Sequence, residues 1–408
     1  MLNPKTNQRE LAYVVAIDEI RPIPNYDRVE HARVGGWWVI VKKDQFKVGD
    51  PAIYIEVDSR VPEEEPFMFL AAKHFKVKTQ KMCKVLSQGL LMHPNDFGWE
   101  IGKADGNYTG FIIIDTKKNI WEIGDFLTEK LGITYAEAED NKRKANSVDK
   151  YKKMTQRRPN IFKKPWARWM MKREWGRRVM FFFFGKKKDK KGGWPAWVIK
   201  TDEERCQNMP WLFPGNPETE WIATEKIDGT STTFTLRGKG RKEEFYICSR
   251  NVVFDRPDKG CYYETNVYTE MAEKYGIYPI LKALKERFEL DFITLQGETY
   301  GEGIQRRDYG LKEHCFMAFN LIYGYPDGRV IRLNPIEMTR ILTEYEVPCV
   351  PIINEHFIIP ESCDILLKIA EGASKVDGGM REGLVFRSAD GVSSFKAVSN
   401  PFLLKYHG

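Results

Sequence analysis

The chain has 408 residues, with 64 Lys and Arg against 57 Asp and Glu, so its formal net charge is +7. Its residues are 42% hydrophobic and 13% aromatic, which excludes a globally disordered chain, and its length favours two or three domains because single cores rarely grow beyond about 250–300 residues. The longest apolar stretch, residues 179–184, is too short to span a bilayer, and residues 1–10 lack the apolar core of a signal peptide.

Residues 11–130 have the pattern of a β-rich domain. Strands with alternating apolar residues are predicted at 12–17, 37–42, 52–57 and 82–91, and turns at 22–26, 35–36 and 48–50. Short strands at this spacing favour a small closed barrel. We therefore expect residues 1–135 to form an OB-like Greek-key barrel.

The basic excess of the chain lies in residues 141–192. This segment contains 20 Lys or Arg and 3 acidic residues, so the other 356 residues carry 44 basic and 54 acidic groups. Trp166, Trp169, Trp175 and four consecutive phenylalanines at 181–184 lie among these cations. The combination is typical of a polyanion partner whose unpaired bases stack on aromatic rings. A solvated linker whose phenylalanines pack on a neighbouring domain and a basic helix on anionic lipid both stay open. We treat 136–193 as a linker or insert.

Residues 194–408 mix helices and strands. Helices are predicted at 268–275 and 279–288, with Pro279 in the first turn of the second, where its missing N–H has no cost. Strands are expected at 223–227, 231–236, 245–248, 292–296, 315–323, 383–386 and 394–396. The fold class is therefore α+β with extensive antiparallel sheet.

Cysteine and histidine provide no metal or disulfide signal. The seven cysteines are scattered without a C-x-x-C spacing, and the six histidines show no metal-ligand spacing. This excludes a cysteine-rich zinc site and a disulfide scaffold. We expect a cytoplasmic protein, in the host cytoplasm if the chain is viral.

One short run, residues 224–234, reads TEKIDGTSTTF. In a strand, Lys226 and Asp228 point to the same face because side chains alternate. One site would thus hold an amine nucleophile and a carboxylate for a metal or a ribose, while Gly229 lets the backbone turn close to a ligand. An isolated K-x-D-G is more often a surface ion pair before a turn, so this run alone is a weak signal.

Further elements follow this run in order. Residues 247–251 read ICSRN, 293–303 ITLQGETYGEG, 315–322 CFMAFNLI, 381–388 REGLVFRS and 394–400 SFKAVSN. Singly, each has an ordinary explanation as a solvated strand-end acid or a core aromatic. Together with K-x-D-G, they resemble motifs I, Ia, III, IIIa, IV and V of the covalent nucleotidyltransferases, which include polynucleotide ligases and mRNA capping enzymes. The resemblance covers residues 200–405.

The order of the parts resembles one branch of this superfamily. DNA ligases and capping enzymes place an OB domain after motif V, whereas here the barrel lies upstream and twelve residues follow Lys396, so we expect no such domain. KTDEERCQN at 200–208 is similar to an element that precedes the catalytic lysine in ATP-dependent RNA ligases with an N-terminal OB domain. The chain departs from the K-x-K of several RNA ligases at Val398, for which Lys405 is a candidate substitute.

The resemblance implies an ATP-grasp-like ligase (adenylyltransferase) domain at 194–408 and an RNA-binding barrel. It implies that Lys226 attacks the α-phosphate of ATP, that Lys396 stabilises the developing charge and that Glu298 assists catalysis. Because a free lysine has a pKa of about 10.4, Lys226 must lose its proton through nearby positive charge or desolvation.

The resemblance also implies a set of binding residues. The ATP site would contain Glu225, Lys226, Ile227, Asp228, Arg250, Asn251, Glu298, Glu382, Lys396 and an aromatic on adenine, Phe319 or else Phe316. Mg²⁺ or Mn²⁺ would be held through Asp228, Asn251, Glu298 and Glu382. RNA or phosphate contacts are expected from Arg205, Lys200, Arg387 and Lys405.

The implied activity is that of a monomeric RNA ligase joining 3′-OH and 5′-phosphate ends through lysyl-AMP and an adenylated RNA end. A capping-type guanylyltransferase using GTP, a DNA ligase and an inactive RNA-binding relative stay open. The natural RNA substrate stays open as well.

Overall fold

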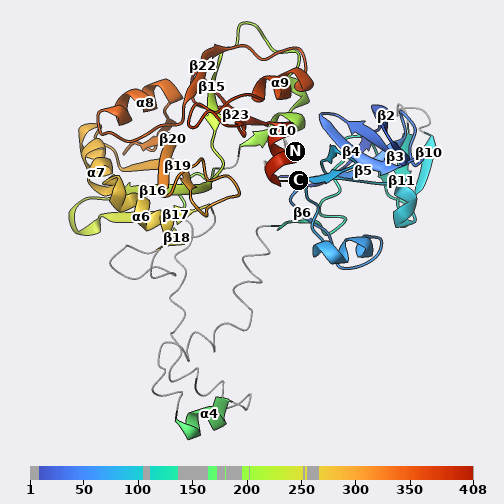
Figure 1. Ribbon diagram of the computed structural model, residues 1–408, viewed down its shortest axis with the longest axis horizontal. Coiled ribbons are helices and arrows are strands. Elements are labelled where there is room, and N and C mark those ends of the chain that lie inside the picture. The colour runs from blue at the N-terminus through green and yellow to red at the C-terminus, as the bar shows by residue number, and fades with distance from the viewer. Residues whose placement is uncertain are drawn as a thin grey trace. The chain divides into compact units, whose positions relative to one another are not determined.

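The computed structural model describes residues 9–103, 111–136, 164–171, 180, 195–201, 203–250, 253–254 and 266–407 (Figure 1). The chain divides into two compact units, residues 1–133 with 194–408, and residues 134–193. Within the second unit the described elements are β13 (Thr134–Tyr135) and α4 (Pro165–Met171). Most of the basic segment 141–192 therefore lies outside the described residues, and its predicted partner stays a prediction.

The N-terminal domain consists of short strands in small antiparallel sheets. One sheet has the order β1-β5-β9 and a second the order β2-β3-β4, while β10-β11-β12 and β7-β8 form smaller ones. The bounds are β1 (Ala12–Ala16), β2 (Glu19–Ile23), β3 (Tyr26–Val34), β4 (Trp37–Lys42), β5 (Pro51–Ile55), β6 (Ser59–Arg60), β7 (Gln80–Met82), β8 (Val85–Ser87), β9 (Leu90–Met92), β10 (Glu100–Lys103), β11 (Phe111–Ile114) and β12 (Ile120–Trp121), with short 3₁₀ turns at Phe67–Lys73 and Pro94–Phe97.

A shared hydrophobic core joins these sheets. In β4, Trp37, Val39 and Val41 are buried and alternate with more exposed residues, as period-2 geometry requires. They pack against Tyr54 of β5 and Leu91 of β9 in one cluster. The predicted strands at 12–17, 37–42 and 52–57 thus become β1, β4 and β5, and one core joins the sheets β1-β5-β9 and β2-β3-β4.

One strand prediction in this domain was wrong in detail, and one turn prediction is confirmed. The predicted strand 82–91 is divided among β7, β8 and β9, because Cys83 and Lys84 form a tight turn with φ of +54° and +63°. Gly89 lies between β8 and β9 with φ of +102°, at a position where a Cβ would overlap the ring of Tyr54. The predicted turn at 22–26 is confirmed, because β2 pairs with β3 up to Ile23 and Tyr26 and the chain turns at Pro24 and Asn25.

The first sheet of the C-terminal domain has six strands in the order β18-β17-β16-β19-β20-β21. Helices α6, α7 and α8 lie beside it in Figure 1. Their apolar faces form one core with the sheet, in which Leu281 and Leu284 of α7 and Phe234 of β16 are fully buried. The bounds are β16 (Thr230–Arg237), β17 (Glu244–Ser249), β18 (Val253–Phe254), α6 (Val267–Lys274), α7 (Ile277–Arg287), β19 (Phe292–Gly301), β20 (His314–Gly324), β21 (Val330–Arg332) and α8 (Pro335–Thr343).

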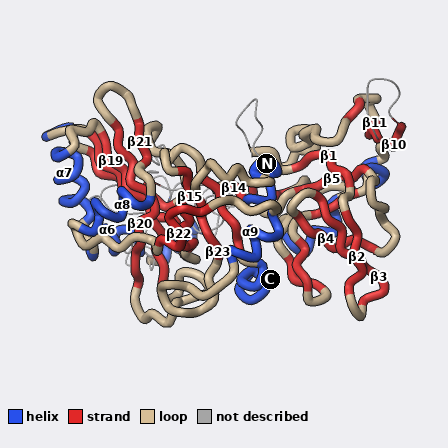
Figure 2. The backbone as a smooth tube through the Cα atoms, turned by 90° about the horizontal axis from the view of Figure 1, so that it is seen from above, coloured by secondary structure: helices blue, strands red, loops and turns tan. Residues whose placement is uncertain are grey.

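The second sheet has five strands in the order β14-β24-β23-β15-β22, with α9 against β24 and close to β23 in Figure 2. All neighbouring pairs are antiparallel except β14 with β24, which are parallel. The bounds are β14 (Glu204–Arg205), β15 (Trp221–Lys226), β22 (Ile352–Phe357), α9 (Cys363–Ala370), β23 (Gly383–Ser388) and β24 (Ser394–Val398), with 3₁₀ turns at Cys206–Asn208, Pro210–Leu212 and Gly240–Lys242 and terminal turns at Asn400–Phe402 and Leu403–His407.

The mixed α+β class with mostly antiparallel sheets is confirmed. The two predicted helices appear as α6 and α7, and α7 begins two residues before Pro279 because Gly276 in the left-handed conformation precedes it. Helices α8 and α9 were missed, although Asn334 and Ser362 are N-caps that accept hydrogen bonds from Glu337 and Ile365. No helix among the described residues is long and apolar enough to cross a membrane.

The core under α7 allows a direct test of the packing. Leu281→Ala removes a fully buried side chain, and we expect it to lower the free energy of unfolding by about 2–5 kcal/mol. Lys282→Ala, at the neighbouring exposed position, should change it by less than about 0.5 kcal/mol. Denaturant unfolding of both variants measures the difference, and similar losses would contradict the assigned helix face.

Candidate active site

The amine of Lys226 lies at the end of β15, within the five-stranded sheet. Its Nζ donates a hydrogen bond to Oε2 of Glu382 at 2.8 Å. Glu382 directly precedes β23, whose first residue, Gly383, is the register partner of Lys226. A Cβ at Gly383 would overlap the carbonyl oxygen of Ala397, so only glycine lets β23 and β24 approach here. This close packing fixes the carboxylate beside the amine.

Three carboxylates act on this amine. Burial by itself would lower the pKa of Lys226, but the charges of Glu382, Glu298 and Asp228 outweigh it and raise that pKa above its ordinary value. Burial also raises the pKa of Glu298 to about 8, because Lys226 compensates only in part and Glu382 and Asp228 add like charge. The unliganded site thus holds an ammonium group among crowded carboxylates.

The loop between β19 and β20 holds the turn after Lys226. The backbone N–H of Asp228 donates to the hydroxyl of Tyr309 at 2.7 Å, and Gln305 donates to the carbonyl of Gly229 at 2.8 Å. Tyr309 is itself held by the buried guanidinium of Arg307, 4.0 Å from its ring centre. Sequence reasoning missed this loop, because nothing in its residues shows that it folds back onto the K-x-D-G turn.

Lys396 and Arg205 lie on the same sheet face as Lys226. Arg205 of β14 is the parallel register partner of Lys396 in β24. Lys396 is opposite Val385 in β23, and Val385 is opposite Thr224 in β15. Directly opposite residues share a face, and Thr224 and Lys226 are two positions apart in β15. The sheet therefore presents three cationic side chains from β15, β24 and β14 on one face.

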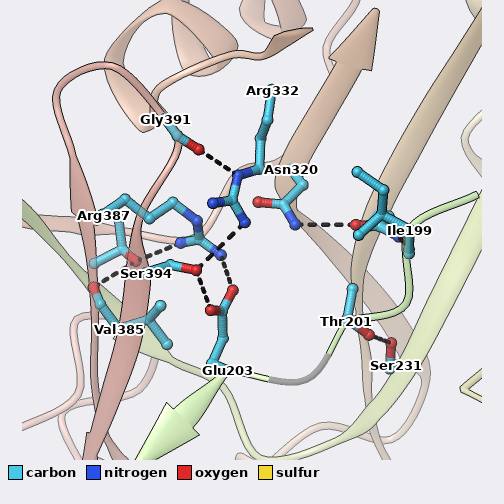
Figure 3. A network of polar contacts seen from close by, with 12 residues as sticks. Ile199, Thr201, Glu203, Ser231, Asn320, Arg332, Val385, Arg387, Gly391 and Ser394 are labelled. Atoms are coloured by element: carbon cyan, nitrogen blue, oxygen red, sulfur yellow. Dashed lines mark hydrogen bonds and ion pairs between the residues drawn. The ribbon is translucent and has the colours of Figure 1, made fainter. Parts of the chain in front are cut away.

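The segment 199–205 joins the two sheets through polar contacts (Figure 3). On the six-stranded side, Thr201 contacts Ser231 at 2.8 Å and the carbonyl of Ile199 accepts from Gln296 at 2.6 Å. On the other side, Glu203 accepts hydrogen bonds from Arg387 and Ser394. The KTDEER element thus contacts both sheets next to Arg205 and fixes the spacing between them.

The N-terminal domain contacts the same element. The indole of Trp37 donates to Oδ1 of Asn208 at 2.8 Å, and Asn208 donates to Glu204 at 2.6 Å. The guanidinium of Arg205 lies 5.8 Å from the Trp37 ring centre, and a Cβ on Gly36 would overlap Gln207. These contacts order the backbone that carries Arg205.

The two aromatic candidates for a base contact lie on opposite faces of β20, since they are an odd number of positions apart. Phe316 is fully buried in the core, edge-on to Phe234, so its predicted role as an alternative adenine contact is corrected. Phe319 packs with Tyr309 and with Ile227, which is next to Lys226 in the chain. Of the two candidates, Phe319 is therefore the one that remains available for a contact with a base.

The remaining predicted residues have different positions. Arg387 is buried and its guanidinium pairs with Glu203 at 3.3 Å, so the expected RNA contact is corrected to an internal role. Glu225 is buried and its side chain accepts from the backbone N–H of Lys375 at 2.8 Å. Arg250 lies close enough to lower the pKa of Glu298, Lys200 and Lys405 are exposed, and Asn251 lies outside the described residues.

The donor set fits a divalent cation that arrives with phosphates. Over the described ranges, no group of three or more His, Cys, Asp or Glu forms a protein-only metal site. Mg²⁺ is usually held by one or two carboxylates together with waters and substrate phosphates. Burial and the like charges of Glu382 and Asp228 raise the pKa of Glu298, so additional positive charge beside it would be favourable. Glu298, Glu382 and Asp228 are therefore suited to hold such an ion.

Comparisons with known proteins agree with this architecture. Residues 11–94 match the model of an OB-fold domain and residues 219–407 match the model of the RNA ligase family. No match was found in the search of curated proteins. Naegleria gruberi RNA ligase solved with PPi is 25% identical, with a TM-score of 0.65, over 98% of this chain and 99% of that one.

Two further structures of that enzyme are similar to the chain. A glutamate-to-alanine mutant with ATP and Mn is 26% identical over 98% of this chain and 100% of that one, with a TM-score of 0.67. Another such mutant with AMP and Mn is 25% identical over 98% and 99%, with a TM-score of 0.65.

The carboxylate crowding predicts a pH-dependent stability. With a pKa of about 8 in the folded state and an ordinary value of 4.5, Glu298 binds more proton in the folded than in the unfolded chain between those pH values. The free energy of unfolding therefore falls as pH rises from about 4.5 to about 8 and stays at the lower value above that. Glu298→Gln should therefore raise the melting temperature in metal-free buffer at pH 8.5, by about 2–4 °C for each kcal/mol gained, and change it little at pH 5. An equal shift at both pH values, measured by calorimetry, would contradict this origin.

Proposed function

Because the chain joins an N-terminal OB-fold domain to an RNA ligase domain, we propose that it is an ATP-dependent RNA ligase that seals a 3′-OH to a 5′-phosphate through a lysyl-AMP intermediate. The observation that carries the proposal is the amine of Lys226 beside Glu382, with Lys396 and Arg205 on the same sheet face. The match of residues 219–407 to the RNA ligase family favours it over a capping-type guanylyltransferase or a DNA ligase. The ATP, AMP and PPi bound to the similar Naegleria enzyme support the nucleotide.

In the first step, the Nζ of Lys226 attacks the α-phosphorus of ATP. A P–N bond forms, the bond to the β-phosphate oxygen breaks, pyrophosphate leaves and the amine loses its proton. Only the neutral amine is nucleophilic, yet the carboxylates around it raise its pKa. Glu298, Glu382 and Asp228 would hold a divalent cation, which would supply positive charge that lowers this pKa and compensates the phosphates. Substrate binding thus activates the lysine.

The cations on the sheet face would stabilise the transferring phosphate. Lys396 and Arg205 are register partners on neighbouring strands, which are about 4.8 Å apart, so one phosphate group can contact both. Such preorganised charges act where negative charge develops in the transition state. Phe319, next to Ile227, would stack on adenine.

In the second step, an oxygen of the RNA 5′-phosphate attacks the adenylyl phosphorus and releases the Lys226 amine, forming a phosphoanhydride. In the third step, the RNA 3′-OH attacks that 5′-phosphate, forms the phosphodiester and releases AMP. Both steps require contacts that hold the RNA, for which we propose residues 1–135 and the linker or insert at 136–193, with the ligase domain at 194–408.

Substitution of the nucleophile tests the proposal. Purified protein incubated with ATP and Mg²⁺ should gain the mass of one adenylyl group on Lys226. Lys226→Ala should abolish this gain, and Lys226→Arg should too, because arginine stays protonated. The exposed Lys282→Ala on α7 should adenylylate normally. A wild-type protein without the adduct, or with it on another side chain, would refute the proposal.

The contact of Tyr309 with the Asp228 backbone predicts a positioning effect. Tyr309→Phe leaves a buried N–H without its acceptor, at a cost of about 1–3 kcal/mol. If this distorts the turn, adenylylation should slow by about 10–100-fold. Tyr325→Phe, beyond the far end of β20, is the matched control and should keep the wild-type rate. An unchanged rate in Tyr309→Phe would show that the phenol does not position the turn.

A further inference from the structure

The β7–β8 region of the N-terminal domain is strongly basic. Residues 73–84 read KHFKVKTQKMCK, with five lysines, one histidine and no acidic residue. The side chains of Lys73, Lys78, Lys81 and Lys84 are exposed. We call residues 73–87 the basic hairpin. It contrasts with the chain outside 141–192, which carries ten more acidic than basic groups.

The tip of the basic hairpin has a constrained backbone. Met82 pairs with Val85, so Cys83 and Lys84 form a two-residue turn, and both have positive φ. Such turns normally contain Asn and Gly, because other residues are strained in this conformation. Residues held in this way depend on the surrounding structure and cluster at functional sites. The turn projects Lys84 from a defined position.

The base of the basic hairpin is fixed on both domains. Ser87 accepts from the backbone of Ile40 at 3.0 Å, and the carbonyl of Leu86 contacts Nε2 of His31 at 2.9 Å. The side chain of Leu86 packs with Val398 and Leu403 of the ligase domain. The hairpin is therefore anchored to the sheet that carries the nucleophile.

This anchor lies close to Lys226. Val398 is the register partner of Gly383, and Gly383 is the register partner of Lys226. Val398 and Lys226 are thus two strand spacings apart, about 10 Å, on the same face. The lysines of the basic hairpin extend from this point into solvent.

Other cations continue the surface toward the nucleophile. Lys405 is exposed on the terminal turn that also contains Leu403. The exposed Arg306 donates to the carbonyl of Tyr406, in the same turn, at 2.9 Å. The neighbouring Gln305 contacts Gly229 of the K-x-D-G turn. Cations therefore extend from the hairpin past the C-terminal turn to the loop over Lys226.

We propose that the basic hairpin, with Lys405 and Arg306, is a track for the phosphate backbone of the RNA strand that enters the active site. The proposal rests on the proposed ligase function and identifies the surface that binds its substrate. Spaced lysines on an exposed ribbon match a chain of phosphates, and binding releases the counterions of those phosphates. A role in binding anionic lipid is the alternative that the experiment separates.

The test combines Lys78→Gln, Lys81→Gln and Lys84→Gln in one variant. The matched control combines Lys42→Gln, Lys43→Gln and Lys47→Gln, which removes the same charge from exposed positions elsewhere in the domain. Affinity for a 5′-phosphorylated single-stranded oligoribonucleotide is measured from about 50 to 200 mM salt. Loss of three phosphate contacts should reduce the slope of log K against log salt by about 2, whereas the control should keep the wild-type slope.

The outcomes separate the two proposals. An unchanged slope in the hairpin variant, an equal change in the control, or weaker binding only to phosphatidylserine vesicles would each overturn the track. Lysyl-AMP formation is assayed without RNA, and the hairpin variant should retain it. Failure of the wild-type protein to form lysyl-AMP would overturn the ligase function, while a slope reduced only in the hairpin variant would still support the RNA track.

Discussion

The ion pair between Lys226 and Glu382 is the interaction on which the site depends. It joins a residue at the end of β15 to one at the start of β23, where Gly383 lets the backbone of β24 come close. With Glu298 and Asp228 nearby, this ion pair favours the charged form of the Lys226 amine. In the proposed reaction, a ligand that brings both phosphate and a divalent cation would change this balance, so Lys226 would become nucleophilic only with its substrate bound.

The rest of the ligase domain places these charges. The five-stranded sheet carries the amine and its cationic neighbours, and the six-stranded sheet contributes Glu298 and the loop with Tyr309. Thr201 and Glu203 of the KTDEER element contact one sheet each. These polar contacts fix the distance between the two sheets more specifically than apolar packing alone would. This role of the contacts explains why a short, largely non-regular segment precedes Lys226.

The N-terminal domain has two connections to the chemistry. Trp37 orders the backbone next to Arg205 through Asn208, and Leu86 anchors the basic hairpin beside Val398. One contact acts on the phosphate-binding side of the site and the other on the surface proposed for RNA. The barrel therefore supports both the nucleotide step and substrate capture in the proposed reaction.

The sequence alone determined much of the ligase domain, because its strands have strong apolar patterns and its reactive residues occur in short motifs of defined spacing. It placed α6 and α7 to within a few residues, and the catalytic roles it assigns to Lys226, Glu298, Glu382 and Lys396 stay predictions. The sequence-based prediction failed where the environment of a residue depends on segments that are far away in the chain. Whether Phe316 or Phe319 faces the site depends on which side of β20 meets the core, and the burial of Arg387 depends on Glu203, 184 positions away. Only the tertiary structure brought Tyr309 to Asp228, Arg205 to Lys396 and the basic hairpin to Val398, since register and loop folding are set by packing between segments that are far apart in the chain.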